Sequence, residues 1–191
     1  MKTTFFLLSA SLALNCALMT ADAALVLTGT SYVQDFNGIG SGLPADWSVN
    51  TGASASSLGT AGATYNATPT SWGDIGGAFK NVASSGLGSG ASLTDQTAAA
   101  DRALAIRQTE AFGDPGAAFV LEVANTAGLN NFSLSIDLQM LSVQTRSTIW
   151  SVQYGLGASP TSFTTLGTYS DPGTFGSTTF TANSTALRAF T

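Results

Sequence analysis

The clearest pattern in the chain is a strict alternation of apolar and polar residues in its second half. Between residues 132 and 140, five apolar residues alternate with polar ones: Phe132, Leu134, Ile136, Leu138 and Met140. A period of two residues is typical of a β-strand that has one face in a core and the other in water. Segments 117–123 and 148–154 repeat this period. The sequence therefore predicts three half-buried strands in this region.

Shorter strands are predicted elsewhere, separated by loops rich in glycine and serine. They cover residues 32–36, 47–49, 78–82, 102–108, 163–169 and 178–181. One helical turn is predicted within 93–101, with Thr94 as its N-cap. Many short strands with turn signals between them predict an all-β fold, an antiparallel two-sheet β-sandwich, with a closed barrel as the lesser option. The last candidate strand, 185–191, fits either an ordinary terminal strand or a chain truncated at its C-terminus.

The N-terminus has the pattern of a secretory signal peptide. Lys2 is followed by an apolar stretch and then by the small residues of Ala21-Asp22-Ala23, which is the order of a signal and its cleavage site. The apolar stretch is shorter than the roughly 20 residues that span a bilayer. We therefore expect residues 1–23 to be a signal peptide and residues 24–191 to be a single secreted or cell-surface β-sandwich domain without a membrane span.

Composition excludes several kinds of chemistry. The chain has no histidine, and its one cysteine, Cys16, lies in the predicted signal. Zinc and copper sites, Ser-His-Asp catalysis and redox thiols need these residues. Charged residues make up 9% of the chain and the net charge is −5, so a basic surface for nucleic acid is not expected. Binding, carboxylate chemistry and oxygen-ligated cations such as calcium remain open.

Carboxylates are the candidates for catalysis and for metal binding. Glu122 and Asp137 lie on adjacent predicted strands and could meet on one face, and a glycosidase needs two carboxyls roughly 5–10 Å apart. An ordinary cross-strand or solvated pair is the simpler explanation. Asp35 and Asp171 lie next to loops with glycine. Calcium takes oxygen ligands from such positions, although both aspartates also fit ordinary turns. Calcium is therefore the one cofactor that we consider.

Aromatic residues are the candidates for ligand binding. Exposed rings form platforms for sugars, and Trp72, in a polar stretch, and Trp47 are the positions that suit such a role. Both side chains also fit a role in anchoring a core or a loop. Trp150 and Tyr154 have the same strand parity as Val152, which favours the core for them.

Two motifs near the start of the predicted domain carry a family resemblance. Tyr32-Val33-Gln34-Asp35-Phe36 and Leu43-Pro44-Ala45-Asp46-Trp47 flank a glycine-rich loop. This arrangement resembles exported bacterial β-sandwich proteins that often carry a C-terminal PEP-CTERM sorting signal. The resemblance implies a jelly-roll-like sandwich at the cell surface or in the extracellular matrix, without known enzymatic activity. The chain departs from that pattern after residue 170, where no Pro-Glu-Pro motif, apolar helix or basic tail follows.

Together these features predict a non-catalytic secreted or cell-surface protein with polysaccharide as the candidate ligand. An extracellular glycan-cleaving enzyme that uses carboxylates is the alternative. A purely structural sandwich is the third possibility.

Export predicts a specific N-terminus. If a signal peptidase cleaves after Ala23, mass spectrometry of the secreted protein should find an N-terminus at Ala24 or Leu25. Recovery of a soluble cytoplasmic form that retains Met1 would contradict the prediction.

Overall fold

The computed structural model describes most of the chain after residue 23. The described residues are 24–62, 64–71, 73, 77–84, 87, 90–107, 109, 112, 116–138, 149–169, 173–180 and 187–189, with the backbone alone described from 169 onward. The predicted signal peptide, Trp72, Met140 and Asp171 lie outside these residues.

The regular secondary structure of the described residues consists almost entirely of strands, so the predicted all-β class is confirmed. The strands are β1 (Trp47–Thr51), β2 (Thr60–Ala61), β3 (Tyr65–Asn66), β4 (Ala78–Ala83), β5 (Arg102–Arg107), β6 (Ala118–Val123), β7 (Phe132–Leu138), β8 (Trp150–Leu156), β9 (Thr164–Tyr169), β10 (Gly173–Phe180) and β11 (Leu187–Ala189). The described helices are a short 3₁₀ turn, η1 (Ile39–Ser41), and α1 (Leu93–Ala98). Neither of these helices has the length and apolar character that crossing a membrane requires.

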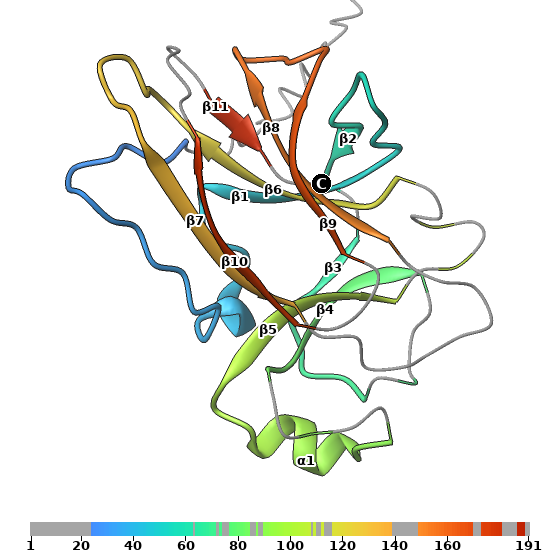
Figure 1. The fold of residues 1–191 in the computed structure, drawn as a ribbon. Coiled ribbons are helices and arrows are strands. Elements are labelled where there is room, and N and C mark those ends of the chain that lie inside the picture. The colour runs from blue at the N-terminus through green and yellow to red at the C-terminus, as the bar shows by residue number, and fades with distance from the viewer. Residues whose placement is uncertain are drawn as a thin grey trace, which may run out of the picture.

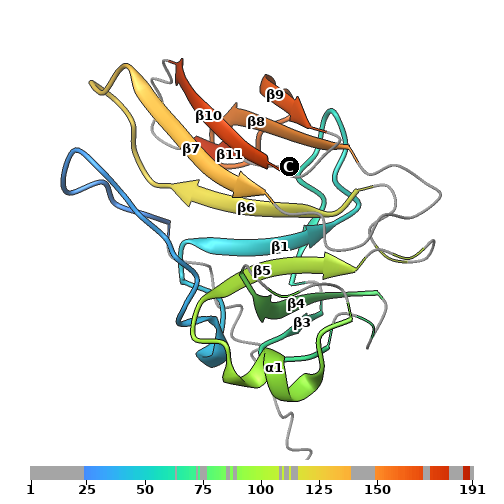
Figure 2. The same ribbon diagram turned by 60° about the horizontal axis from the view of Figure 1, so that its bottom comes forward.

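The described strands form three sheets rather than the two that were expected. Their orders are β2-β1-β6-β11-β8-β9, β3-β4-β5 and β10-β7. Figure 2 shows β7 and β10 on one side of β6 and β1, with β5, β4 and β3 on the other side and α1 beyond them. All strand pairs are antiparallel except β3 with β4, where the long connection between the two strands lets the chain return in the same direction. Jelly-roll connectivity stays a prediction.

The alternation predicted for residues 132–138 is confirmed. Phe132, Leu134, Ile136 and Leu138 are partly buried, whereas the intervening Ser133, Ser135 and Asp137 are exposed. The strand pairs with β10, and Figure 1 shows these two strands as a ribbon in front of β1 and β6. The apolar side of β7 therefore faces the rest of the molecule without being fully covered by it.

Two local predictions were wrong. Residues 32–36 form no strand; Phe36 has a φ of 57°, and both carboxylate oxygens of Asp35 accept bonds from Asn37, which turns the chain. The N-cap of α1 is Ser92, not Thr94. The Ser92 hydroxyl accepts a bond from Asp95 N, and the Asp95 carboxylate accepts one from Ser92 N. This reciprocal capping box begins the helix two residues earlier than an N-cap at Thr94 would.

A chain of aromatic rings joins the three-stranded sheet to the six-stranded sheet. Phe79 of β4 is fully buried, with ring centroids 5.5 Å from Phe112 on one side and 5.5 Å from Phe119 of β6 on the other. Val49 and Ile106 are buried in the same cluster. Edge-on contacts between such rings add to the stabilisation from apolar burial.

A buried arginine holds the other end of the three-stranded sheet. Arg102 is 6% exposed and donates to the Asn81 side chain at 2.7 Å and to the carbonyl oxygens of Asn81, Gln96 and Ala99. Gln96 and Ala99 lie at the C-terminal end of α1, where the helix dipole favours a cation. The Arg102 amide N–H donates to Asn37 at 2.8 Å. One residue therefore joins α1, β4 and the loop before η1.

Replacing Arg102 tests this anchor. Arg102→Met should lower the free energy of unfolding by about 3 kcal/mol or more, because several buried acceptors lose a charged donor. Arg107→Met is the matched control on the same strand: Arg107 donates at the surface to one carbonyl, that of Gly73, and should cost less than about 1 kcal/mol. Urea unfolding of both variants measures the difference. Equal losses of unfolding free energy in the two variants would show that the buried contacts of Arg102 stabilise the fold no more than the surface contact of Arg107.

Candidate functional site

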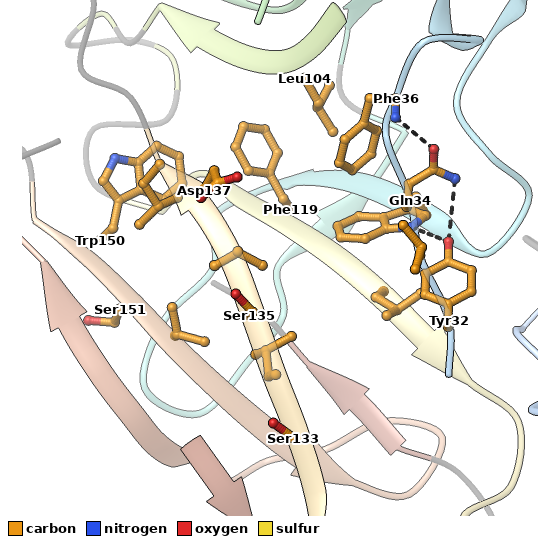
Figure 3. A pocket seen from close by; sticks show the side chains of 17 residues that line it. Tyr32, Gln34, Phe36, Leu104, Phe119, Ser133, Ser135, Asp137, Trp150 and Ser151 are labelled. Atoms are coloured by element: carbon orange, nitrogen blue, oxygen red, sulfur yellow. Dashed lines mark hydrogen bonds between the residues drawn. The ribbon is translucent and has the colours of Figure 1, made fainter. Parts of the chain in front are cut away.

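The main candidate site is a cavity of about 460 Å³ between β7 and the inner face of the six-stranded sheet. Its volume lies within the roughly 300–1,000 Å³ of typical small-ligand sites. The lining residues are Tyr32, Val33, Gln34, Phe36, Trp47, Leu104, Phe119, Leu121, Ser133, Leu134, Ser135, Ile136, Asp137, Leu138, Trp150, Ser151 and Val152. Figure 3 shows Tyr32, Gln34 and Phe36 at one end, Trp150 at the other and Phe119 between them.

Strand register places the rings on one face of the sheet. Trp47 of β1 is opposite Leu121 of β6, and Val49 is opposite Phe119; residues directly opposite each other in an antiparallel pair share a face. The Phe119 ring stacks on Trp150 of β8 at a centroid distance of 5.2 Å and an angle of 20°. Phe119 thus continues the buried ring chain from Phe79 to the wall of the cavity.

The other end of the cavity has a hydrogen-bonded group. Trp47 Nε1 donates to the Tyr32 hydroxyl at 2.8 Å, and Gln34 Nε2 donates to the same oxygen at 3.4 Å. The Gln34 amide oxygen accepts from the Phe36 N–H at 2.8 Å, and the Phe36 ring lies edge-on to Trp47 at 4.9 Å. These contacts hold the Trp47 indole in one orientation, with its polar edge toward Tyr32.

Phe36 has a left-handed backbone, with a φ of 57°. This conformation is uncommon for bulky residues and costs on the order of 1–3 kcal/mol. The hydrogen bonds that Asn37 N donates to Asp35 and that Phe36 N donates to Gln34 offset part of that cost. Strain of this kind occurs often at ligand sites, because it places a side chain where a relaxed backbone would not.

The partly buried carboxylate of Asp46 neighbours the Tyr32 hydroxyl. Burial first, and then the neighbouring Asp46 carboxylate, raise the pKa of Tyr32 above its ordinary value of 10.0. The bonds from Gln34 and Trp47 act in the opposite direction without offsetting this rise. Oδ2 of Asp46 is buried and accepts no hydrogen bond from the part of the chain that the structure describes. The Tyr32 hydroxyl therefore stays protonated across the neutral range.

The polar groups of the cavity complete its chemistry. Ser133, Ser135 and Asp137 follow one another along β7 in Figure 3, with Asp137 on the side of Trp150. Of the described lining residues, Asp137 is the one with a charged side chain. Because these three residues alternate with the partly buried Leu134, Ile136 and Leu138, their exposed side chains belong to the rim of the cavity. The cavity thus combines aromatic and aliphatic walls with the Tyr32 hydroxyl and the Gln34 amide.

The binding residues considered from the sequence have different positions in the structure. Trp47 lines the cavity, whereas Trp72 lies outside the described residues. Trp150, which strand parity assigned to the core, does pack against the buried cluster of Val49, Phe79 and Ile106. It is only partly buried and also lines the cavity, a role that parity did not predict. Tyr154 does pack against the buried Leu121 and Val123.

Several lining residues were not singled out from the sequence as ligand contacts, chiefly Phe119, Gln34 and Phe36. Tyr32 and Phe36 belong to the motif that carries the family resemblance, which was the available signal for that end of the cavity. Nothing in the sequence marked Phe119 as a ligand contact, because its position in the alternation of residues 117–123 is that of an ordinary core residue. Its position at the cavity depends on which strands flank β6.

Glu122 and Asp137 were considered from the sequence as a catalytic pair, but the structure does not place them on neighbouring strands. The strands that carry Glu122 and Asp137 were predicted to be adjacent, but β6 belongs to the six-stranded sheet and β7 pairs with β10. Glu122 alternates with Leu121 and Val123, which are buried on the inner face, so its side chain is on the opposite face from the cavity. A catalytic pair of these two carboxylates across the cavity is not supported by this arrangement.

Asp35 borders a second hollow of about 440 Å³ that residues 38–44 help to line. Both of its carboxylate oxygens accept bonds from Asn37, whose own amide oxygen accepts from Arg102 N. Asp35 therefore has a structural use in orienting Asn37. Within the described ranges, no three Asp, Glu, His or Cys side chains come together as a metal site. Calcium at Asp35 stays a prediction, and Asp171 lies outside the described residues.

Comparisons with known proteins returned no match: no family model, no curated protein and no solved structure is significantly similar to the chain. Function is therefore argued from the chemistry of the cavity.

Removing the Tyr32 hydroxyl tests the hydrogen-bonded end of the cavity. Tyr32→Phe should lower the free energy of unfolding by about 1–2 kcal/mol at neutral pH, because Trp47 Nε1 loses its acceptor. The raised pKa of Tyr32 makes its stabilising contribution complete below a pH of about 10 and lost as the pH rises through the folded-state pKa. The difference between wild type and variant should therefore shrink above pH 10. Urea unfolding at neutral and alkaline pH measures this difference, and a pH-independent value would contradict the assignment.

Proposed function

We propose that the chain is a non-catalytic, exported β-domain of the cell surface or extracellular matrix that binds polysaccharide in the cavity between β7 and the six-stranded sheet. One observation carries this proposal. Trp47, Phe119 and Trp150, from three different strands, line a single cavity together with hydroxyl and amide groups.

Sugar rings present both kinds of surface that such a cavity complements. Their axial C–H faces pack against indole and phenyl rings, and their hydroxyl groups need donors and acceptors. The Tyr32 hydroxyl and the Gln34 amide can each donate and accept, and both residues line the cavity. A site of apolar walls with a few polar groups that set orientation is the usual form of a small-ligand site.

The rings are also held in position before any ligand arrives. Trp47 is fixed by Tyr32 and Phe36, and Trp150 is stacked on Phe119. Binding then requires little additional ordering of side chains, which reduces the entropic cost of association.

Two further observations support the non-catalytic and exported parts of the proposal. A glycosidase of the usual kind needs two carboxyls on opposite sides of the scissile bond, and one carboxylate is found among the described lining residues.

Leu25, two positions after the predicted cleavage site, is hydrogen-bonded into the sheet: its N–H donates to Glu122 O at 2.7 Å, and its carbonyl oxygen accepts from Ala124 N at 2.8 Å. That position suits a domain that begins just after a removed signal.

A glycan array combined with a reducing-sugar assay tests the proposal. Wild-type protein should bind a subset of glycans without releasing reducing ends. Trp47→Ala should weaken that binding about tenfold or more, because a stacking ring is lost, and Trp47→Phe, which retains a ring, should weaken it less. Leu156→Ala is the control, since Leu156 is 46% exposed and does not line the cavity; its binding should be unchanged. Near-ultraviolet circular dichroism confirms that each variant is folded.

Two outcomes would overturn the proposal. Release of reducing ends by the wild-type protein would favour the glycan-cleaving alternative. Absence of binding to every glycan would favour a structural sandwich whose cavity has no ligand of this class.

A further inference from the structure

We propose that the cavity holds a deoxyhexose unit of its glycan, a sugar such as fucose or rhamnose that carries a methyl group where other hexoses carry a hydroxymethyl group. That methyl group would lie against the aliphatic wall of the cavity. This inference rests on the proposed polysaccharide-binding function and names the class of sugar. It comes from the division of the cavity into a long apolar wall and a small polar end.

The wall of the cavity is lined by aliphatic side chains that face inward. Leu134, Ile136 and Leu138 form the partly buried side of β7, and Leu121 and Val152 of the six-stranded sheet are buried. All five line the cavity. Such a surface gains free energy from contact with another apolar group and offers a hydroxyl no partner. The part of a ligand that touches this wall is therefore expected to be apolar.

The polar residues of the neighbouring strand positions do not change the character of this wall. Ser133, Ser135 and Asp137 are exposed and alternate with the apolar residues of β7. Ser151 comes directly before the buried Val152 on β8. Successive side chains of a strand point to opposite sides, so these four side chains do not supply hydrogen bonds to the inner wall.

The polar groups at the end formed by residues 32–36 are largely bonded to one another (Figure 3). The Tyr32 hydroxyl accepts from Trp47 Nε1 at 2.8 Å and from Gln34 Nε2 at 3.4 Å. The Gln34 amide oxygen accepts from the Phe36 N–H at 2.8 Å. Among the bonds that the structure describes, Gln34 keeps one N–H and one lone pair for a ligand. This end therefore suits a sugar that brings few hydroxyls into the cavity.

A deoxyhexose divides its surface in the same way as the cavity. Its methyl group and the adjoining ring C–H form a continuous apolar edge, and its hydroxyls lie around the rest of the ring. With the methyl group against the β7 wall, the hydroxyls can point toward Gln34 or the solvent. An ordinary hexose in the same orientation would bury one more hydroxyl without a partner, which weakens binding.

The test compares two pairs of methyl glycosides by nuclear magnetic resonance titration, which detects weak binding. The pairs are L-fucoside with L-galactoside and L-rhamnoside with L-mannoside, and the members of each pair differ only by the one hydroxyl. The deoxy member of at least one pair should bind about tenfold more tightly, the effect of one hydroxyl placed in an apolar site. This comparison uses wild-type protein and needs no variant.

Leu134→Gln and Leu138→Gln test the wall, with Leu156→Gln as their matched control. All three replace leucine by a residue of similar size that can bond to a hydroxyl, but Leu156 is 46% exposed and does not line the cavity. The preference for the deoxy sugar should fall in at least one of the two wall variants, because the additional hydroxyl gains a partner there. It should be unchanged in Leu156→Gln. Near-ultraviolet circular dichroism confirms that each variant is folded.

The outcomes separate this inference from the proposed function. Absence of the preference in both pairs, failure of all four glycosides to bind, or a preference that survives both wall substitutions would overturn the deoxyhexose assignment. Polysaccharide binding would still stand if the glycan array is positive. A negative array together with four glycosides that do not bind would overturn both.

Discussion

The contact between Phe79 and Phe119 is the interaction on which the rest of the structure depends. It joins the three-stranded sheet to the six-stranded sheet through a row of rings that runs from Phe112 to Trp150. The predicted domain contains no cysteine and few charged residues, so disulfides and ion-pair networks contribute little and apolar packing has to hold the sheets together. The last ring of this row is also a wall of the cavity, which makes the site an extension of the core.

The N-terminal side of the cavity depends on a different set of contacts. Residues 32–36 form no strand, and their position is set by Asn37, which accepts from the Arg102 amide, and by the bond from Trp47 to Tyr32. Arg102 in turn is held by the end of α1 and by β4. The helix does not line the cavity, yet it stabilises the start of β5, to which this side of the site is attached through Asn37.

Local patterns predicted much of the fold. The period of two in residues 132–138 assigned every side chain of β7 to its correct face, because alternation depends only on the strand itself. The strand expected at 32–36 and the Thr94 cap were wrong, because a side-chain bond from Asp35 and the Ser92–Asp95 capping box decided those positions. Trp47 was considered as a binding residue, but Trp150 was assigned to the core alone. Its place in the cavity wall depends on how the sheets are arranged around β8, which leaves no trace in a single segment.

The most direct test of the central claim is a nuclear magnetic resonance titration with a glycan that the array identifies as a ligand. The chain has three tryptophans, so three indole N–H signals are expected, and the variants Trp47→Phe and Trp150→Phe assign the signals of the two that line the cavity. We predict that the signals of Trp47 and Trp150 shift together with the methyl signals of Leu134 and Ile136, while those of the buried Val82 do not. Shifts confined to exposed residues outside the cavity, such as Val26 and Leu156, with Trp47 and Trp150 unchanged, would contradict the account.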